Sequence, residues 1–182
     1  MISDSGKKNL LLLARQAIES VIKGSNPPEL DLYEPIFDEI HGAFVTLYLH
    51  NELKGCIGNI NGKSTLKEDI SELAVASATR DHRFKPVSAD EVEDIHIEIS
   101  VLSPLEEVKD TSEIVIGEHG LIIESGFNRG VLLPQVPVEE NWDTITFLQF
   151  TCQKAGLSPD DWKLRNTKIY RFTTFRFSES EE

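Results

Sequence analysis

The sequence predicts an α+β protein built on a largely antiparallel sheet with flanking helices. Segments with helical and with strand-like spacing follow one another without regular alternation, which argues against a doubly wound parallel sheet. Two of the strand-like segments are joined by only two residues, as in an antiparallel hairpin. The chain has 182 residues and 40% hydrophobic content, enough to bury the core of one domain or of two small interleaved lobes.

Apolar residues at helical spacing predict three helices, at 7–23, 66–79 and 143–155. Gly24 and Gly156 follow the first and third segments, where glycine commonly ends a helix. Thr65 and Glu68 precede and open the second segment as a capping box, in which each side chain binds a free backbone N–H group of the other residue.

Alternating or β-branched segments predict the strands, at 42–50, 53–57, 95–101, 114–116, 120–124, 130–133 and 169–177. Asn51 and Glu52 form the turn of the first hairpin, and residues 125–129 form a later turn. Proline and polar residues make 25–35 an extended connection. The charged tail at 178–182 is expected to be disordered.

Composition excludes several classes of function. The chain has 18 Lys and Arg against 31 Asp and Glu, a formal charge of -13, which opposes binding to nucleic acid through phosphate neutralisation. The longest apolar run, Leu10 to Ala14, is too short to cross a membrane, and no early segment resembles a signal peptide. We therefore expect a cytoplasmic protein. Its two cysteines, Cys56 and Cys152, are expected to be free thiols.

The segment Leu53-Lys54-Gly55-Cys56-Ile57-Gly58 is the most informative motif, because it sets one thiol between two glycines after a strand-like run. Glycine lets a backbone approach a ligand closely. Glycines in strands also mark bulges and tight bends, and a free cysteine often behaves as a small buried hydrophobe. The motif therefore predicts either a reactive site or a packed turn.

Other segments accompany this motif in a fixed order along nearly the whole chain. They are Gly42-Ala43-Phe44-Val45-Thr46-Leu47 before the cysteine motif and, after it, Asp81-His82-Arg83-Phe84-Lys85-Pro86-Val87, Glu98 to Pro104, His119-Gly120-Leu121, Arg129 to Val136, Glu139, Trp142 and Ala155-Gly156-Leu157. Together these segments resemble the AMMECR domain family, also called AmmeMemoRadiSam system protein A. Lys54 and His82 stand where that family usually has arginine and proline; lysine keeps the charge but loses the planar fork of arginine.

The resemblance implies one domain over 1–182 with two lobes, in which the two ends of the chain share the larger lobe. A cleft between the lobes would be the natural ligand site. The resemblance also implies association with a Memo-type protein and a radical-SAM protein. This chain has only two cysteines and lacks the three needed to hold an iron-sulfur cluster for the radical step.

Three residues are candidates for catalysis. Cys56 is the candidate nucleophile, and His119 or Glu98 would move its proton. Gly55 and Gly58 would bind substrate, with backbone amides of their segment stabilising developing negative charge. The alternatives are that His119 caps a turn or lies in solvent, and that Glu98 is exposed or in an ion pair.

Two further residues are candidates for substrate binding. Arg83 could orient a carboxylate or phosphate through two parallel N–H bonds, or it could pair with Asp81 or Glu98. Gln135 could bind a ligand, or it could satisfy exposed backbone at the end of a strand. The sequence does not show whether these residues converge with Cys56.

No cofactor or structural metal site is predicted. Neither a His-Glu-x-x-His nor a Cys-x-x-Cys pattern is present, and phosphate loops and dinucleotide fingerprints are also missing from the sequence. Cys152 lies at helical spacing with Ile145 and Leu148 and is expected in the core. A metal site formed by Cys56, His119 and Glu98 stays open, because ligands can converge from distant segments.

Two functions follow from these residues. The first is an enzyme or enzyme component that uses Cys56 in covalent chemistry on a small anionic substrate. The second is a non-catalytic binding or adaptor module for a peptide or metabolite, acting with Memo-type and radical-SAM partners. A third interpretation is that the motif around Cys56 is only a packed turn.

Overall fold

The computed structural model describes residues 2–25 and 33–179. The chain divides into two compact units. The first unit contains the residues up to Leu102 and those from Phe175 onward, and the second contains Ser103–Thr174. Within the described residues, no helix is both long and apolar enough to cross a bilayer. Each unit is described below by itself.

The first unit contains the helices α1 (Asp4–Lys23) and α2 (Leu66–Thr79) and the short 3-10 helix η1 (Pro35–Asp38). The prediction for α2 is confirmed, including its capping box of Thr65 and Glu68. The helix α1 begins three residues earlier than predicted, because the Ser3 hydroxyl accepts a hydrogen bond from the Gly6 N–H group and caps it.

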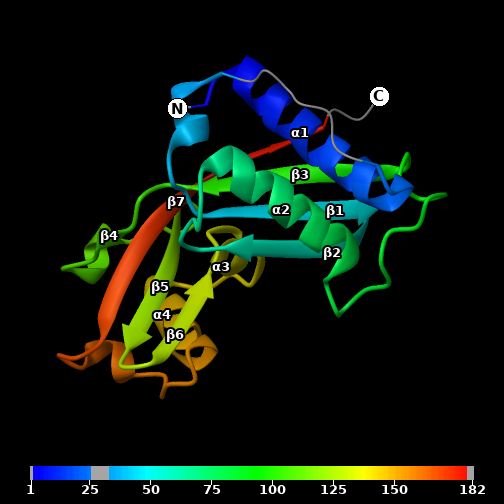
Figure 1. Cartoon of the computed structure of the whole chain (residues 1–182). Coiled ribbons are helices and arrows are strands. Elements are labelled where there is room, and N and C mark those ends of the chain that lie inside the picture. Colours follow the sequence, from blue (N-terminus) through cyan, green and yellow to red (C-terminus); the bar gives the residue numbers. More distant parts are fainter. Residues whose placement is uncertain (1, 26–32, 180–182) are drawn as a thin grey trace. The chain divides into compact units, whose positions relative to one another are not determined.

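The sheet of the first unit is antiparallel, as predicted. It contains β1 (Ala43–Leu49), β2 (Glu52–Asn59) and β3 (Ile95–Leu102) in the order β2-β1-β3, with the end of β7 (Lys168–Ser178) next to β3. Both α1 and α2 lie over the same face of this sheet (Figure 1). The β1–β2 turn has positive φ at His50 and Asn51, and the hairpin register shifts between Leu47 and Tyr48.

Strand register places two different sets of side chains on the two faces of this sheet. Val45 pairs with both Ile57 and Ile99, and all three belong to the apolar core that packs beneath the helices. The next position on each strand points to the opposite face. On that face, Thr46 pairs with Cys56 on one side and with Glu98 on the other. The two candidate catalytic residues and the threonine between them therefore form one row across the sheet.

The second unit is a smaller sheet with two helices. Its strands are β4 (Glu106–Glu107), β5 (His119–Ser125), β6 (Asn128–Leu132) and the first part of β7, which lies between β4 and β5. The helices are α3 (Gln135–Glu139) and α4 (Thr144–Lys154), and two 3-10 turns, η2 (Thr111–Glu113) and η3 (Asp161–Lys163), complete the unit. Its core contains Ile114, Leu121, Ile123, Phe147, Leu148 and Cys152.

Two predictions about this architecture need correction, and one helix was not predicted. The expected strand at 114–116 is instead a segment that leads into a turn at Ile116, because Ile114 and Ile116 pack into the second core while the Val115 carbonyl accepts the His119 N–H group. The helix that was not predicted is α3, which begins at Gln135. Within the tail expected to be disordered at 178–182, Ser178 ends β7.

Glu179 is ordered as well, because its carboxylate binds Arg15 through two contacts of 2.6 Å and accepts the Ile97 N–H group at 2.9 Å. Residues 180–182 of the predicted tail lie outside the described residues, as do residues 26–32 of the extended connection predicted at 25–35.

Candidate functional site

The strand segment around Cys56 is held against α2 by a side chain inserted at the β1–β2 pair. The Ser77 hydroxyl accepts the Ile57 N–H group at 3.0 Å and donates to the Val45 carbonyl at 2.8 Å. This hydroxyl therefore bridges two residues that are partners in the strand register. Helix and strand can approach so closely because residue 55 is glycine: a Cβ atom there would collide with the Ser77 carbonyl oxygen.

Asp81 anchors the other side of the same segment. Its side chain is only 4% exposed, and one carboxylate oxygen accepts the Cys56 N–H group at 2.9 Å. Hydrogen bonds from the Arg83 guanidinium are the main cause that holds the pKa of the Asp81 carboxyl far below its usual range, and the Cys56 N–H group adds to the effect. Asp81 is therefore an ionised, almost fully enclosed group beneath the cysteine backbone.

Arg83 is bound to Asp81 and to the cysteine backbone at once. Its Nε and Nη2 atoms donate to the two Asp81 carboxylate oxygens at 3.0 and 2.7 Å, and Nη2 also donates to the Cys56 carbonyl at 3.1 Å. Five N–H groups are available on a guanidinium, and these contacts use the whole Nε/Nη2 edge. The two parallel N–H bonds that the sequence suggested for a substrate anion are thus made to Asp81, and only Nη1 remains.

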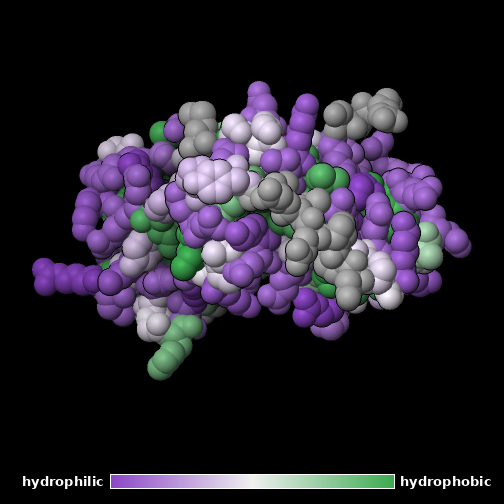
Figure 2. Space-filling model, turned by 45° about the horizontal axis from the view of Figure 1, so that its top comes forward, coloured by the Kyte–Doolittle hydropathy of each residue, from purple (hydrophilic) through white to green (hydrophobic). Residues whose placement is uncertain are grey.

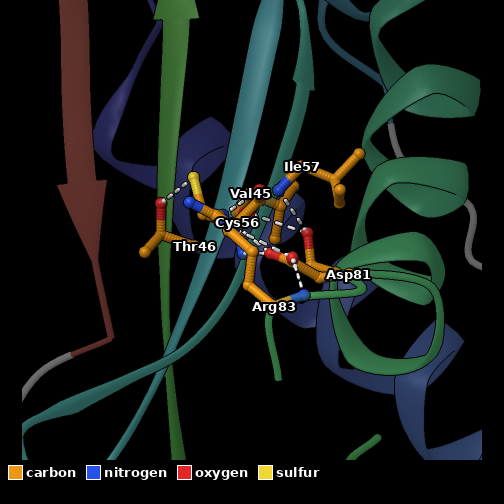
Figure 3. Close-up of polar contacts among 7 residues, drawn as sticks. Val45, Thr46, Cys56, Ile57, Asp81 and Arg83 are labelled. Atoms are coloured by element: carbon orange, nitrogen blue, oxygen red, sulfur yellow. Dashed lines mark hydrogen bonds and ion pairs between the residues drawn. The ribbon is translucent and has the colours of Figure 1, made fainter. Parts of the chain in front are cut away.

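The thiol of Cys56 projects from the sheet face opposite the helices, next to Thr46 (Figure 3). The Thr46 hydroxyl donates to the Cys56 sulfur at 3.3 Å. Asp81 is the main cause that raises the pKa of the Arg83 guanidinium, and the Cys56 side chain contributes in the same direction. The half-buried thiol therefore has a hydroxyl donor at its sulfur, and the Arg83 guanidinium is bound to the carbonyl of the same residue.

The backbone amides near the thiol are already used. The Cys56 N–H group binds Asp81 and the Ile57 N–H group binds Ser77. Neither of them is free to stabilise negative charge on a substrate, contrary to the expectation for this glycine-flanked segment. Gly58 also has a packing role, because a Cβ atom there would collide with the Phe44 ring.

Glu98 shares the sheet face of Cys56 but does not contact it. Thr46 stands between them in the register, so their Cβ atoms are two strand spacings apart, about 10 Å. The Glu98 carboxylate lies 3.7 Å from Nε of Arg176 in an ion pair, which was one of its predicted alternatives. Proton transfer between Glu98 and the thiol would therefore need Thr46 or a water molecule as a relay.

His119 and Gln135 belong to the second unit. Nδ1 of His119 accepts the Val115 N–H group at 3.0 Å, and the side chain is buried. Because that lone pair is occupied, a neutral His119 carries its proton on Nε2 and can donate but not accept there. Gln135 is the first residue of α3, following Pro134.

Three residues of the site were not predicted from the sequence. Asp81 was predicted only as a partner of Arg83, and no role was predicted for Thr46 or Ser77. Thr46 is a polar residue between Val45 and Leu47, both fully buried, so its alternation could have placed it on the face of Cys56. No signal in the sequence reports the Ser77 bridge, which depends on how closely α2 approaches the sheet.

Lys54 stands at a position where arginine is usual in the family that the chain resembles, and it is also bound within the chain. Its Nζ atom lies 2.8 Å from both carboxylate oxygens of Glu91. Among the residues that the structure describes, no group of three His, Cys, Asp or Glu side chains has an arrangement that could hold a metal ion. The functional groups that the structure places in this region are therefore the Cys56 thiol, the Thr46 hydroxyl and the Arg83 guanidinium.

Comparison with known proteins identifies the family. The AMMECR1 family profile matches residues 11–177, which is most of the chain. The chain belongs to the AMMECR1 family. A relative from Methanosarcina mazei is 40% identical, with 100% of this chain and 95% of the relative covered. Protein MJ0810 from Methanocaldococcus jannaschii is 43% identical, with 92% and 87% covered.

The fold of this AMMECR1-family chain also matches a solved structure, that of the uncharacterized protein PH0010 from Pyrococcus horikoshii. The TM-score is 0.87 at 40% sequence identity, and the match covers 98% of this chain and 94% of that one. The similarity confirms the α+β fold with an antiparallel sheet and flanking helices.

Proposed function

We propose that Cys56 is the nucleophile of a cytoplasmic enzyme, or enzyme component, that acts on a small anionic substrate with an electrophilic carbon. The observation that carries this proposal is the Thr46 hydroxyl bound to the Cys56 sulfur, with the Arg83 guanidinium bound to the carbonyl of the same residue. A hydrogen bond and a nearby cation both stabilise a thiolate relative to a thiol, and the thiolate is the reactive form.

In the proposed step, the Cys56 sulfur forms a bond to the electrophilic carbon, and the electron pair of the broken bond goes to the leaving group or to a carbonyl oxygen. The thiol proton moves to a base before or during the attack. Glu98 and His119 stay the candidates for proton transfer. Glu98 would accept the proton through a relay, and His119 would donate a proton to the product.

The position of Arg83 supports a narrower role than the sequence suggested. With its Nε/Nη2 edge bound to Asp81, Arg83 offers Nη1 and a positive field near the thiol, which would attract an anionic substrate without clamping it through two bonds. Gly55, Gly58 and Gln135 stay predicted substrate contacts, although packing against α2 and Phe44 already accounts for the two glycines.

Alkylation of Cys56 tests the activation of the thiol. Iodoacetamide rates would be measured across pH by peptide mass spectrometry in the wild type and in Thr46→Val and Thr46→Ser. We expect Thr46→Val to lower the rate at neutral pH about fivefold to tenfold, because one hydrogen bond to the thiolate is lost, and Thr46→Ser to retain the rate. Equal rates in all three proteins, or a wild-type rate no higher than that of glutathione, would refute the proposal.

A second pair of reagents tests the anionic substrate. Iodoacetate and iodoacetamide react alike and differ in charge, so the ratio of their rates at Cys56 reports the local field. We expect this ratio to exceed that of glutathione, and Arg83→Gln to reduce it toward the glutathione value. If Arg83→Gln leaves this ratio unchanged, the proposal no longer includes an anionic substrate, and only the proposed role of the Cys56 thiol remains.

A binding or adaptor module is the second candidate, and a specific observation favours it. The amide and carbonyl of Cys56 and the main edge of Arg83 are all bound within the chain, as in a segment built for rigidity. In this proposal the first unit would hold a peptide or metabolite and act with Memo-type and radical-SAM partners. Unchanged partner binding in Cys56→Ala, together with an unactivated thiol, would support it.

A further inference from the structure

The tip of the β5–β6 hairpin carries a large hydrophobic side chain that packing does not explain. The strand register continues to the pair Ser125 and Asn128, which leaves Gly126 and Phe127 as the two turn residues. Gly126 has φ of 61°, as such turns require, whereas Phe127 is completely exposed, at 109% of its reference area. Glycine, asparagine, aspartate and serine dominate these turns, so the phenylalanine has no local structural reason.

A second exposed hydrophobic residue lies on the neighbouring loop. Leu164 is half exposed and belongs to the segment that leads into β7. This segment lies against the hairpin, because Asn166 Nδ2 contacts Ser125 Oγ at 3.4 Å and Lys168 pairs in register with Glu124. Figure 1 shows the loop and the hairpin tip at the same end of the second unit.

Both segments are held firmly at their bases. Trp162 packs against the second core just before Leu164, and the strand pairing of β5 with both β6 and β7 reaches Glu124. A surface fixed in this way loses little conformational entropy when a partner binds. The exposure of Phe127 and Leu164 therefore belongs to an ordered structure.

Arg165 gives this surface a positive charge in a chain of formal charge -13. The neighbouring Lys163 is paired with Asp160 at 2.7 Å, so within the part of the chain that the structure describes, the charge that remains unpaired in this loop is that of Arg165. Arg165 is exposed, and among the described residues no carboxylate lies within ion-pairing distance of its guanidinium. We call Phe127, Leu164 and Arg165 together the tip surface.

We propose that the tip surface docks an acidic segment of another protein that carries aromatic or aliphatic side chains. Phenylalanine and arginine are enriched at protein interfaces, and a central aromatic side chain commonly supplies much of the binding energy. Figure 2 shows a molecular face that is mostly hydrophilic, with only small hydrophobic patches, so a fully exposed phenylalanine is unusual for this surface. The charge of -13 disfavours nucleic acid as the occupant.

Peptide selection on the full chain tests this proposal. A displayed random-peptide library would be enriched on the wild type at low salt, and one enriched peptide would be synthesised for calorimetry. We expect acidic peptides with aromatic or aliphatic residues, and a Kd at least tenfold weaker for Phe127→Ser. Val138→Ser is the matched control, because Val138 is an exposed hydrophobic residue of the same unit and should leave the Kd unchanged.

The charge of the occupant is tested separately. Arg165→Glu and 0.5 M salt should each weaken the acidic peptide several-fold, because exposed charges are screened. Phe127 makes no buried contact, so Phe127→Ser should unfold at the wild-type temperature; Leu164→Ser repeats the test if it does not. Enrichment of basic peptides, no enrichment, or equal binding by Phe127→Ser would overturn the proposal, as would tighter binding of a single-stranded oligonucleotide that depends on Phe127.

Discussion

The two cysteines of this chain occupy opposite kinds of surroundings. Cys152 lies in α4 with none of its surface exposed, and burial raises the pKa of its thiol. Cys56 lies half-buried on β2, with the Thr46 hydroxyl at its sulfur and its backbone bound by Asp81 and Arg83. The Cys152 thiol is kept from water, while the Cys56 thiol has a hydroxyl donor at its sulfur and a guanidinium at the carbonyl of the same residue.

The difference shows that the surroundings of a cysteine depend on groups that its own segment does not contain. In α4 the surroundings of Cys152 are apolar side chains of one small core. Around Cys56 they come from β1, from the end of α2 and from the turn that follows it. The residues of that turn fix the strand within the first unit, and the same contacts bring the Arg83 guanidinium to the Cys56 carbonyl.

The largest expected effect is a difference in accessibility. In the native protein, iodoacetamide should modify Cys56 more than about a hundredfold faster than Cys152, because Cys152 reacts only when its core opens. In 8 M urea the two rates should converge to within a few-fold. Peptide mass spectrometry on the same samples measures both sites. Comparable native rates would mean that the second core opens readily, and the contrast between the two thiols would disappear.

The next effect concerns Asp81, which organises the cysteine segment. Asp81→Ala should lower the free energy of unfolding by about 2–3 kcal/mol, because a buried carboxylate with several hydrogen bonds is lost and the Cys56 N–H group is left without a partner. Urea titration measures the loss. Asp4→Ala is the control, since Asp4 is exposed and should change the midpoint little.

The contribution of Asp81 to stability depends on pH with a definite sign. The pKa of Asp81 is lowered in the folded protein, mainly by Arg83, so its stabilisation is complete above the ordinary aspartate range and is lost as the pH falls from that range toward the lowered pKa of the folded protein. Asp81→Asn should therefore flatten the acid side of the stability profile. A profile as steep as that of the wild type would show that other carboxylates dominate acid unfolding.

Local sequence signals predicted much of the fold. The capping box at Thr65 and Glu68 predicted α2 to the residue, β-branched and aromatic residues predicted β1, and alternation predicted β3. The strand at 114–116 was wrong because alternating isoleucines also suit an extended segment that packs without a partner strand. The order of Glu179 depends on Arg15, 164 residues away, which no local pattern reports.

The candidate site was less predictable for the same reason. The motif around Cys56 could be recognised locally, but its function in the fold depends on contacts between distant positions. Asp81 reaches the Cys56 amide across 25 residues and Ser77 reaches the Ile57 amide across 20. These contacts use the groups that the sequence offered to a substrate, so the structure changes the predicted roles of Arg83 and the backbone amides.

A smaller effect distinguishes packing from chemistry at the same strand. Gly55→Ala would place a Cβ atom against the Ser77 carbonyl, and Ser77→Ala would remove the bridge between Ile57 and Val45; each should cost about 1–2 kcal/mol. Differential scanning calorimetry on both variants measures the loss. Gly126→Ala is a control for steric collision, because its Cβ would meet no atom and its cost would come only from positive φ. If Gly55→Ala does not change the stability, α2 must be able to move away from the strand and make room for the added Cβ atom.

The smallest expected effect sharpens the comparison at Cys56 itself. Glu98 and Cys56 flank Thr46 on the same sheet face, but Glu98 pairs with Arg176 and lies about two strand spacings from the thiol. Glu98→Gln should therefore change the alkylation rate of Cys56 by less than about twofold, far less than Thr46→Val. A tenfold change would show that Glu98 couples to the thiol through the Thr46 hydroxyl. Cys56, Thr46 and Glu98 would then act as one proton relay across three strands. Cys56 would differ from Cys152 in its coupling to this row of polar groups as well as in its immediate surroundings.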